Sequence, residues 1–152
     1  MTATMRGNEY RDLVASYIAR NFDVLEVYTE VSLGKTIIGK DRKVDVFVVR
    51  AGDSQALAVE CKYQESQGTV EEKIPYALGD IEAMRVDGCL VYAGTGWSRG
   101  ILHTLEASPN AAYCLPGADL QRTARTRELD HIIAATFGLW STIIPDRRRF
   151  GP

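Results

Sequence analysis

Hydrophobic residues follow two different spacings in the first part of the chain, which predicts a helix followed by three strands. In residues 8–22 apolar side chains recur every three to four positions, as in an amphipathic helix with Asn8 as its N-cap. The following segments alternate, or are rich in β-branched and aromatic residues, which is typical of strands. Glycine-containing turns separate them, so the second and third strands form a hairpin. The predicted strands are residues 24–33, 44–50 and 56–64.

The second part of the chain alternates helical segments with short apolar runs. A helix either starts with a kinked first turn or begins at Pro75, because proline cannot continue a helix from within. The resulting order αβββαβαβα predicts an α/β fold, with a mixed sheet of about five strands flanked by helices on both faces, in one domain over residues 1–152. The remaining predicted elements are a strand at 88–94, a helix at 98–108, a strand at 111–115 and a long helix at 118–140.

Composition and net charge limit the classes of protein that the chain can belong to, but they do not identify its function. The chain has 152 residues, 45% of them hydrophobic and 25% charged, which suits one domain with its own core. It has no apolar run of membrane-spanning length and no signal-peptide segment, so no membrane contact is expected. Cys61, Cys89 and Cys114 are odd in number and lie in apolar runs, which indicates buried thiols in a reducing cytoplasm. The net charge of −2 argues against strong nonspecific nucleic-acid binding but permits a local basic patch.

The candidate chemistry lies on the hairpin. In residues 56–64, "ALAVECKYQ", every second residue is apolar, so Glu60 and Lys62 project together from the opposite face. Asp45, on the preceding strand, is then able to sit beside Glu60. Two converging carboxylates repel each other unless a proton or a cation lies between them. With oxygen donors only, the suitable cation is Mg²⁺ or Mn²⁺. Lys62 adds a charge that can contact a phosphate and orient water, so the set predicts a phosphodiester hydrolase.

The pattern resembles the PD-(D/E)XK nuclease superfamily, which includes restriction endonucleases, junction resolvases and repair nucleases. Asp45 matches the aspartate of its motif, Glu60 the acidic position and Lys62 the lysine, on a hairpin that follows an N-terminal helix. The similarity covers residues 7 to about 100 in element order as well as in motif. Val44 replaces the family's weakly held proline. The resemblance implies a restriction-endonuclease-like fold.

The resemblance also implies further site residues. Glu9 matches a glutamate on the first helix that reaches toward the metal in many members, and Gln64 matches a polar residue that often follows the lysine. The main-chain carbonyl of Cys61 is a candidate third metal ligand beside Asp45 and Glu60. The segment "GTVEEKIPY" resembles one found after the catalytic strand in some restriction enzymes, where Glu72 and Lys73 would line the cleft.

Other interpretations of these residues stay open. Glu60 and Lys62 would also suit an exposed pair on a solvent-facing strand, and Glu9 would suit the first turn of a helix. The loop "GTGWSRG" at 94–100 looks like a nucleotide cradle but fits no phosphate-binding spacing, so a tight turn is favoured, from which Trp97 and Arg99 could reach DNA. The basic side chains near the C-terminus suit a solvated face or contacts to a DNA backbone. They are Arg122, Arg125, Arg127 and the run 147–149.

These observations lead to one functional hypothesis and two rivals. The chain is expected to be a Mg²⁺-dependent endodeoxyribonuclease, with Mn²⁺ able to substitute, which acts on DNA in a restriction-like or junction-resolving manner. A homodimer or higher homo-oligomer is expected, because each chain offers one site and a duplex has two strands. Its predicted interface is the final helix, with Ile132, Ile133, Phe137 and Trp140. The first rival is a catalytically silent DNA-binding accessory subunit with the same fold. The second is an unrelated α/β protein that binds a small phosphate ligand.

Overall fold

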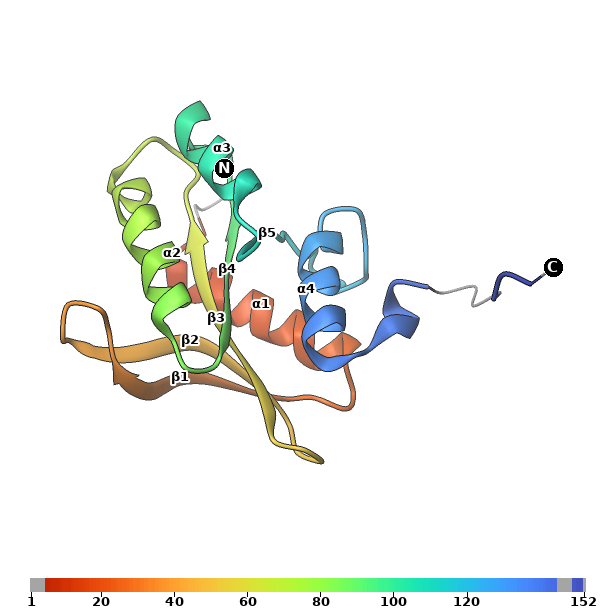
Figure 1. The fold of residues 1–152 in the computed structure, drawn as a ribbon. Helices are drawn as coiled ribbons and strands as arrows, with labels where there is room; N and C mark the ends of the chain where they lie inside the picture. Colours follow the sequence, from red (N-terminus) through yellow and green to blue (C-terminus); the bar gives the residue numbers. More distant parts are fainter. Residues whose placement is uncertain (1–4, 145–148, 152) are drawn as a thin grey trace.

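A five-stranded mixed sheet organises the molecule, as seen in the computed structural model, which describes residues 5–144 and 149–151 (Figure 1). The strands are β1 (Glu26–Lys35), β2 (Asp41–Arg50), β3 (Gln55–Tyr63), β4 (Asp87–Ala93) and β5 (Ala111–Tyr113). The helices are α1 (Gly7–Asn21), α2 (Ile74–Ala83), α3 (Arg99–Ala107) and α4 (Arg127–Phe137). Two 3₁₀ helices, η1 (Thr69–Lys73) and η2 (Trp140–Thr142), lie in the connections.

The strands occur in the sheet in the same order as in the chain. Strands β1, β2 and β3 form an antiparallel meander, as the short glycine-containing turns require. Helix α2 carries the chain back so that β4 pairs parallel with β3, and α3 does the same for β5. The predicted mixed α/β sheet of five strands is confirmed.

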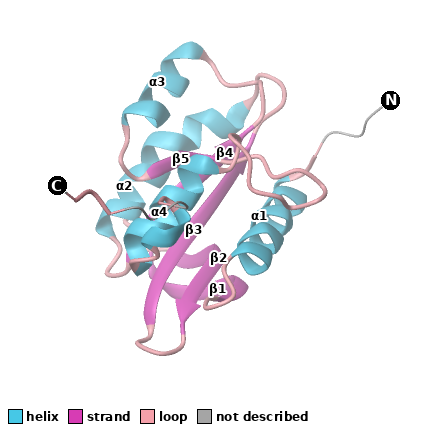
Figure 2. Ribbon diagram, turned by 90° about the vertical axis from the view of Figure 1, so that its right-hand side faces the viewer, coloured by secondary structure: helices cyan, strands magenta, loops and turns pink. Residues whose placement is uncertain are grey.

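Each face of the sheet carries its own hydrophobic core. On one face α1 and α4 pack on β2, β3 and β4, and on the other α2 and α3 cover β4 (Figures 1 and 2). The predicted alternation in β3 is confirmed, because Leu57, Val59 and Cys61 all enter the α1/α4 core. Glu60 and Lys62 therefore project toward the α2 side. All three cysteines are free and buried, as predicted.

The final helix is shorter than predicted. Residues 118–126 form two turns joined by irregular chain, and α4 begins at Arg127. Local side-chain bonds explain the difference: the Asp119 carboxylate accepts from the Gln121 N–H (3.2 Å) and the Thr123 hydroxyl accepts from the Arg125 N–H (3.1 Å). Such bonds offer the backbone an alternative to the helix. The helix ends at Gly138, whose φ of 69° is left-handed.

The predicted dimer interface on this helix is wrong in part. Ile133 and Phe137 are buried in the protein's own α1/α4 core, so they are not available to a second copy. Trp140 lies beyond the end of the helix and is exposed.

Two turns differ in detail from the sequence prediction. The β1–β2 turn is confined to residues 36–40, because the Thr36 N–H donates to the Lys40 carbonyl and both strands continue up to it. Before α2 the chain forms the 3₁₀ turn η1, and Pro75 then stands in the first turn of α2, where its missing N–H leaves no helical bond unmade. Within the described ranges, no helix combines the length and the apolar character needed to cross a membrane.

Candidate active site

The candidate site forms where β2 and β3 separate. Their pairing runs from Arg50 opposite Gln55 to Val46 opposite Val59, and Asp45 and Glu60 are the next residues on the two strands. At this point the Asp45 carboxylate accepts a hydrogen bond from the main-chain N–H of Cys61 (2.8 Å). The side chain of Asp45 thus replaces the strand bond that the divergence removes, and it is held beside Glu60.

Glu60 is a half-buried carboxylate next to a second one. Burial, followed by the neighbouring charge of Asp45, raises the pKa of Glu60 to about 8, and the Lys62 ammonium opposes this shift. Both main causes penalise the ionised form. The pair of carboxylates therefore favours a proton or a cation between them, as predicted from the sequence.

Glu60 and Lys62 line a cleft of about 330 Å³ between the β1–β2 hairpin and α2. Since side chains alternate along β3, the two charges lie on the same face of the strand. Lys43 and Lys73 line the same cleft and add positive charge around it. The remaining lining residues include Thr36, Asp41, Tyr76 and Ala77. The cleft is thus lined by Glu60 and by three lysines, Lys43, Lys62 and Lys73, whose positive charge suits an anionic substrate.

A buried ion pair forms one wall of the cleft. The Arg42 guanidinium donates to both carboxylate oxygens of Asp80 on α2, at 3.0 Å from Nε and 2.7 Å from Nη2. The Ile37 N–H also donates to Asp80 (3.1 Å). The Arg42 bond is the main reason that the pKa of Asp80 lies below its usual range. The pair fastens the tip of the β1–β2 hairpin to α2.

Comparison with known families shows which superfamily the chain belongs to. A family model described as "PD-(D/E)XK nuclease superfamily domain" matches residues 6–140. The chain belongs to this superfamily. The resemblance drawn from Asp45, Glu60 and Lys62 is therefore confirmed, and the nuclease-like assignment extends over nearly the whole chain.

Two solved structures resemble this nuclease-superfamily domain in part. The crystal structure of a protein of unknown function, AF1548, has a TM-score of 0.43 and 15% identity, and covers 64% of this chain and 53% of its own. A repair endonuclease from Pyrococcus abyssi has a TM-score of 0.40 and 14% identity, and covers 73% of this chain and 47% of its own. The chain thus spans about half the length of each. A search of curated protein sequences found no significant match.

Gln64 lies two residues beyond Lys62 along the chain, but it is buried. Its amide nitrogen donates to the Gly96 carbonyl (3.0 Å) and approaches the Glu71 carboxylate (3.4 Å). Its amide oxygen is buried and has no hydrogen-bond partner within the described part of the chain. These contacts tie Gln64 to the loop after β4. Its predicted catalytic role in this nuclease-superfamily site stays a prediction.

Glu9 lies at the start of α1 and is exposed. Its carboxylate accepts from the main-chain N–H of Arg6 (3.3 Å), a bond that caps the helix. Helix α1 packs on the sheet face opposite to the one from which Glu60 and Lys62 project. The described hydrogen bonds and ion pairs do not join Glu9 to Asp45, Glu60 or Lys62. Its site role likewise stays a prediction.

The loop at 94–100 is a tight structural turn. Gly94 has a φ of 102°, and a side chain there or at Gly96 would collide with the backbone of Gln64 or Ser66. Trp97 is buried, with its indole N–H donating to the Ala93 carbonyl (2.9 Å), so the predicted approach of Trp97 to DNA is wrong. Arg99 is exposed.

The other residues predicted to line the cleft or to contact DNA lie in different parts of the molecule. Lys73 lines the cleft, whereas Glu72 is exposed and is not among the lining residues. Arg122 donates to the Asn21 carbonyl and lies over the Phe22 ring, on the side of the sheet away from the cleft. Arg125 and Arg127 are exposed. Of the basic run at 147–149, the first two positions lie outside the described residues.

Local sequence pattern does not identify two residues of the cleft wall, Arg42 and Asp80, or a third residue near Gln64. Arg42 occupies a position in phase with the buried Val44, Val46 and Val48, and a charge in that phase signals a buried partner. That partner, Asp80, lies 38 residues away, so local pattern could not identify it. The third is Glu71, whose carboxylate accepts from the Ser98 N–H at the start of α3 (3.0 Å).

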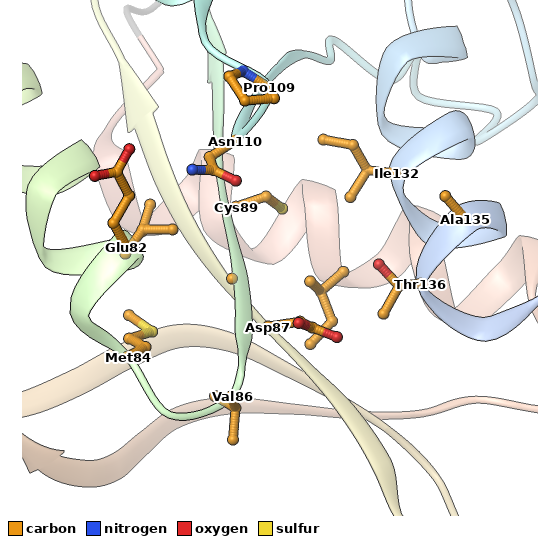
Figure 3. Close-up of a pocket in the computed structure, with 13 residues that line it drawn as sticks. Glu82, Met84, Val86, Asp87, Cys89, Pro109, Asn110, Ile132, Ala135 and Thr136 are labelled. Atoms are coloured by element: carbon orange, nitrogen blue, oxygen red, sulfur yellow. The ribbon is translucent and has the colours of Figure 1, made fainter.

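A second hollow, of about 450 Å³, lies at another part of the molecule (Figure 3). It is bordered by α2, β4 and α4, with Glu82, Asp87 and Asn110 among its polar side chains. Asp45, Glu60 and Lys62 do not line it. It therefore does not belong to the motif site.

Proposed function

We propose that this protein is a metal-dependent endodeoxyribonuclease that hydrolyses phosphodiester bonds of DNA in the cleft between the β1–β2 hairpin and α2. One observation carries the proposal: Asp45 and Glu60 meet where β2 and β3 diverge, with Lys62 on the same face. The superfamily assignment supports nuclease chemistry in general. The three retained motif positions favour an active enzyme over a silent DNA-binding subunit.

The donor set fits a hard divalent cation. Asp45 and Glu60 supply only oxygen, and among residues 5–144 and 149–151 no group of three or more His, Cys, Asp or Glu side chains is placed to hold a metal ion. A site with two carboxylates suits Mg²⁺, which usually keeps several waters and takes phosphate oxygens of the substrate as further ligands. Nucleases of this superfamily generally use divalent metals. Mg²⁺ is the proposed ion, with Mn²⁺ as a substitute.

Asp45, Glu60 and the Cys61 carbonyl are the proposed ligands. The thiol of Cys61 enters the α1/α4 core, so only its main chain is available to the site. The bond from the Cys61 N–H uses one oxygen of Asp45 and leaves the other for a cation. When bound, the metal supplies positive charge that polarises the phosphate and lowers the pKa of water.

Lys62 orients the attacking water and neutralises charge on the phosphate. Its ammonium is a compact point charge with three donors, which suits a non-bridging phosphate oxygen and a water at the same time. Attack by water on phosphorus displaces one ester oxygen, which leaves as an alcohol after taking up a proton. Lys43 and Lys73 hold the flanking phosphates of the strand in the cleft.

We also propose an oligomeric state and a cellular compartment for the protein. Cleavage of both strands of a duplex requires two copies of the site, so a homodimer or higher assembly is proposed. The three buried free thiols agree with a reducing compartment, the cytoplasm.

The proposed activity is tested on a panel of supercoiled, linear, branched and single-stranded DNA, with Mg²⁺, Mn²⁺ or EDTA. Internal cuts that depend on the metal and disappear in Glu60→Gln are expected. Asp41→Asn, which changes an exposed carboxylate on the rim of the same cleft, is the matched control and should still cut. A wild-type protein that binds DNA but cuts no member of the panel would instead be the silent DNA-binding subunit.

A further inference from the structure

The turn that joins β1 to β2 is held in one conformation by its own hydrogen bonds. The Thr36 N–H donates to the Lys40 carbonyl (2.7 Å), and the Gly39 N–H donates to the Thr36 carbonyl (2.9 Å). The Thr36 hydroxyl accepts from the Lys40 N–H (3.2 Å). The tip is therefore a preformed structure.

The same turn is also fastened to α2. Asp80 accepts from the Ile37 N–H, and its other bonds come from the buried Arg42 guanidinium. Arg42 donates in turn to the Leu33 carbonyl of β1 (3.4 Å). Displacing the tip would break the bond from the Ile37 N–H to Asp80, which is itself one partner of a buried ion pair, and such a loss is unfavourable.

This rigid tip presents two adjacent apolar side chains to solvent. Ile37 is 51% exposed and Ile38 is 60% exposed, and we name the two together the isoleucine tip. Tyr76 on α2, which lines the cleft, is 37% exposed. Exposed apolar groups on a turn that is fixed by its own hydrogen bonds and by a bond to Asp80 indicate a contact surface rather than a mobile loop.

The isoleucine tip lies on the rim of the cleft that holds Glu60 and Lys62. Thr36, the residue before it, lines that cleft together with Lys43 and Lys73. A partner that fits both features has negative charge for the lysines and apolar faces for the isoleucines. Nucleic acid with accessible base faces has both properties, whereas a continuous duplex offers mainly phosphate at its surface.

We propose that the isoleucine tip is a wedge that packs against bases next to the phosphate bound in the cleft. The preferred substrate class is then DNA whose bases are already unstacked: a bulge, a mismatch, a branch or a single-stranded segment. Isoleucine is among the apolar side chains that proteins insert between base steps, and the insertion is easiest where stacking is already lost. This inference rests on the proposed nuclease function and identifies its substrate.

The test compares the Ile37→Ser/Ile38→Ser variant with wild type on two DNAs in Ca²⁺, which permits binding without rapid cleavage. One DNA is a continuous duplex and the other carries a central bulge flanked by 2-aminopurine. The control is Val24→Ser/Ile144→Ser, which changes two apolar side chains of similar exposure that do not line the cleft. Thermal melts verify that each variant is folded.

Wild type and control should bind the bulged DNA more tightly and raise the 2-aminopurine fluorescence. The tip variant should bind the bulged DNA about tenfold more weakly, with little change on continuous duplex, and should lose the fluorescence rise. Equal binding and fluorescence in wild type and tip variant would overturn the wedge while leaving the nuclease intact.

Two other outcomes also overturn the wedge. If wild type neither binds nor cuts any DNA, the proposed function fails and the wedge fails with it. If light scattering shows a wild-type dimer that the tip variant converts to monomer, the isoleucine tip is an interface between copies of this chain.

Discussion

Two carboxylates that line the same cleft, Asp80 and Glu60, differ in the charges around them. Asp80 receives both arms of the Arg42 guanidinium and the Ile37 N–H, and its pKa is lowered. Glu60 has a second carboxylate, Asp45, as its neighbour, and its pKa is raised to about 8. Asp80 and Arg42 form a complete cluster, because their charges cancel within the protein itself. Glu60 and Asp45 form an incomplete cluster, because it needs a proton or a cation between the two carboxylates. This difference separates a structural ion pair from a candidate catalytic site.

The largest expected effect comes from Lys62, which stands beside the incomplete cluster. Lys62→Ala should lower the cleavage rate roughly a hundredfold to a thousandfold, because the ammonium acts mainly on the water and the phosphate in the transition state. Metal binding by Asp45 and Glu60 should remain. Cleavage and gel-shift assays on the same DNA separate the two roles. A modest loss of DNA affinity with unchanged cleavage at saturating DNA would make Lys62 a phosphate contact only.

The second largest effect, on the free energy of unfolding, is expected from breaking the complete cluster of Arg42 and Asp80. Asp80→Ala leaves Arg42 buried without its counterion and should lower the free energy of unfolding by about 3 kcal/mol. Asp41→Ala removes the exposed ion pair with Lys35 and should have little effect, because both side chains are largely in solvent. Urea unfolding at neutral pH measures both. Similar losses in the two variants would contradict the structural role of the Arg42–Asp80 pair.

The pH dependence of that stability has a defined sign. Since the pKa of Asp80 is lower in the folded protein, the ionised carboxylate stabilises the fold above its unfolded pKa of about 4, and this contribution is lost as the pH falls through the folded value. The difference in unfolding free energy between wild type and Asp80→Ala should therefore narrow below about pH 4. Urea unfolding between pH 7 and pH 3 gives the measurement. A gap that widens on acidification would contradict the assignment.

The smallest effect concerns repulsion within the incomplete cluster. Without metal, Asp45→Asn should be neutral or should stabilise the protein by up to about 1 kcal/mol, because it removes the charge that disfavours ionised Glu60 and keeps an acceptor for the Cys61 N–H. Added Mn²⁺ should stabilise wild type but not the variant. Thermal melts in EDTA and in Mn²⁺ provide the comparison. A strongly destabilised metal-free variant would show that the two carboxylates do not repel each other.

The sequence was sufficient to predict the incomplete cluster but not the complete one. Asp45, Glu60 and Lys62 lie on one hairpin, so the period of two along each strand determines which face they share. The bond between Arg42 and Asp80 joins a strand to a helix across an intervening strand, and no local pattern specifies it. The burial of Gln64 likewise depends on a distant loop, where Gly96, 32 residues further on, comes close to it. Helix α4 is shorter than its hydrophobic pattern predicts because the side chains of Asp119 and Thr123 bind the local backbone.

Calorimetry with Mn²⁺ tests most directly whether the incomplete cluster is a cation site. Wild type should bind Mn²⁺, weakly because the phosphate ligands are missing, and Asp45→Asn should lose the binding. Asp41→Asn, at the rim of the same cleft, should bind as wild type does. Equal Mn²⁺ affinity in wild type and Asp45→Asn would contradict the assignment of the metal to this pair of carboxylates.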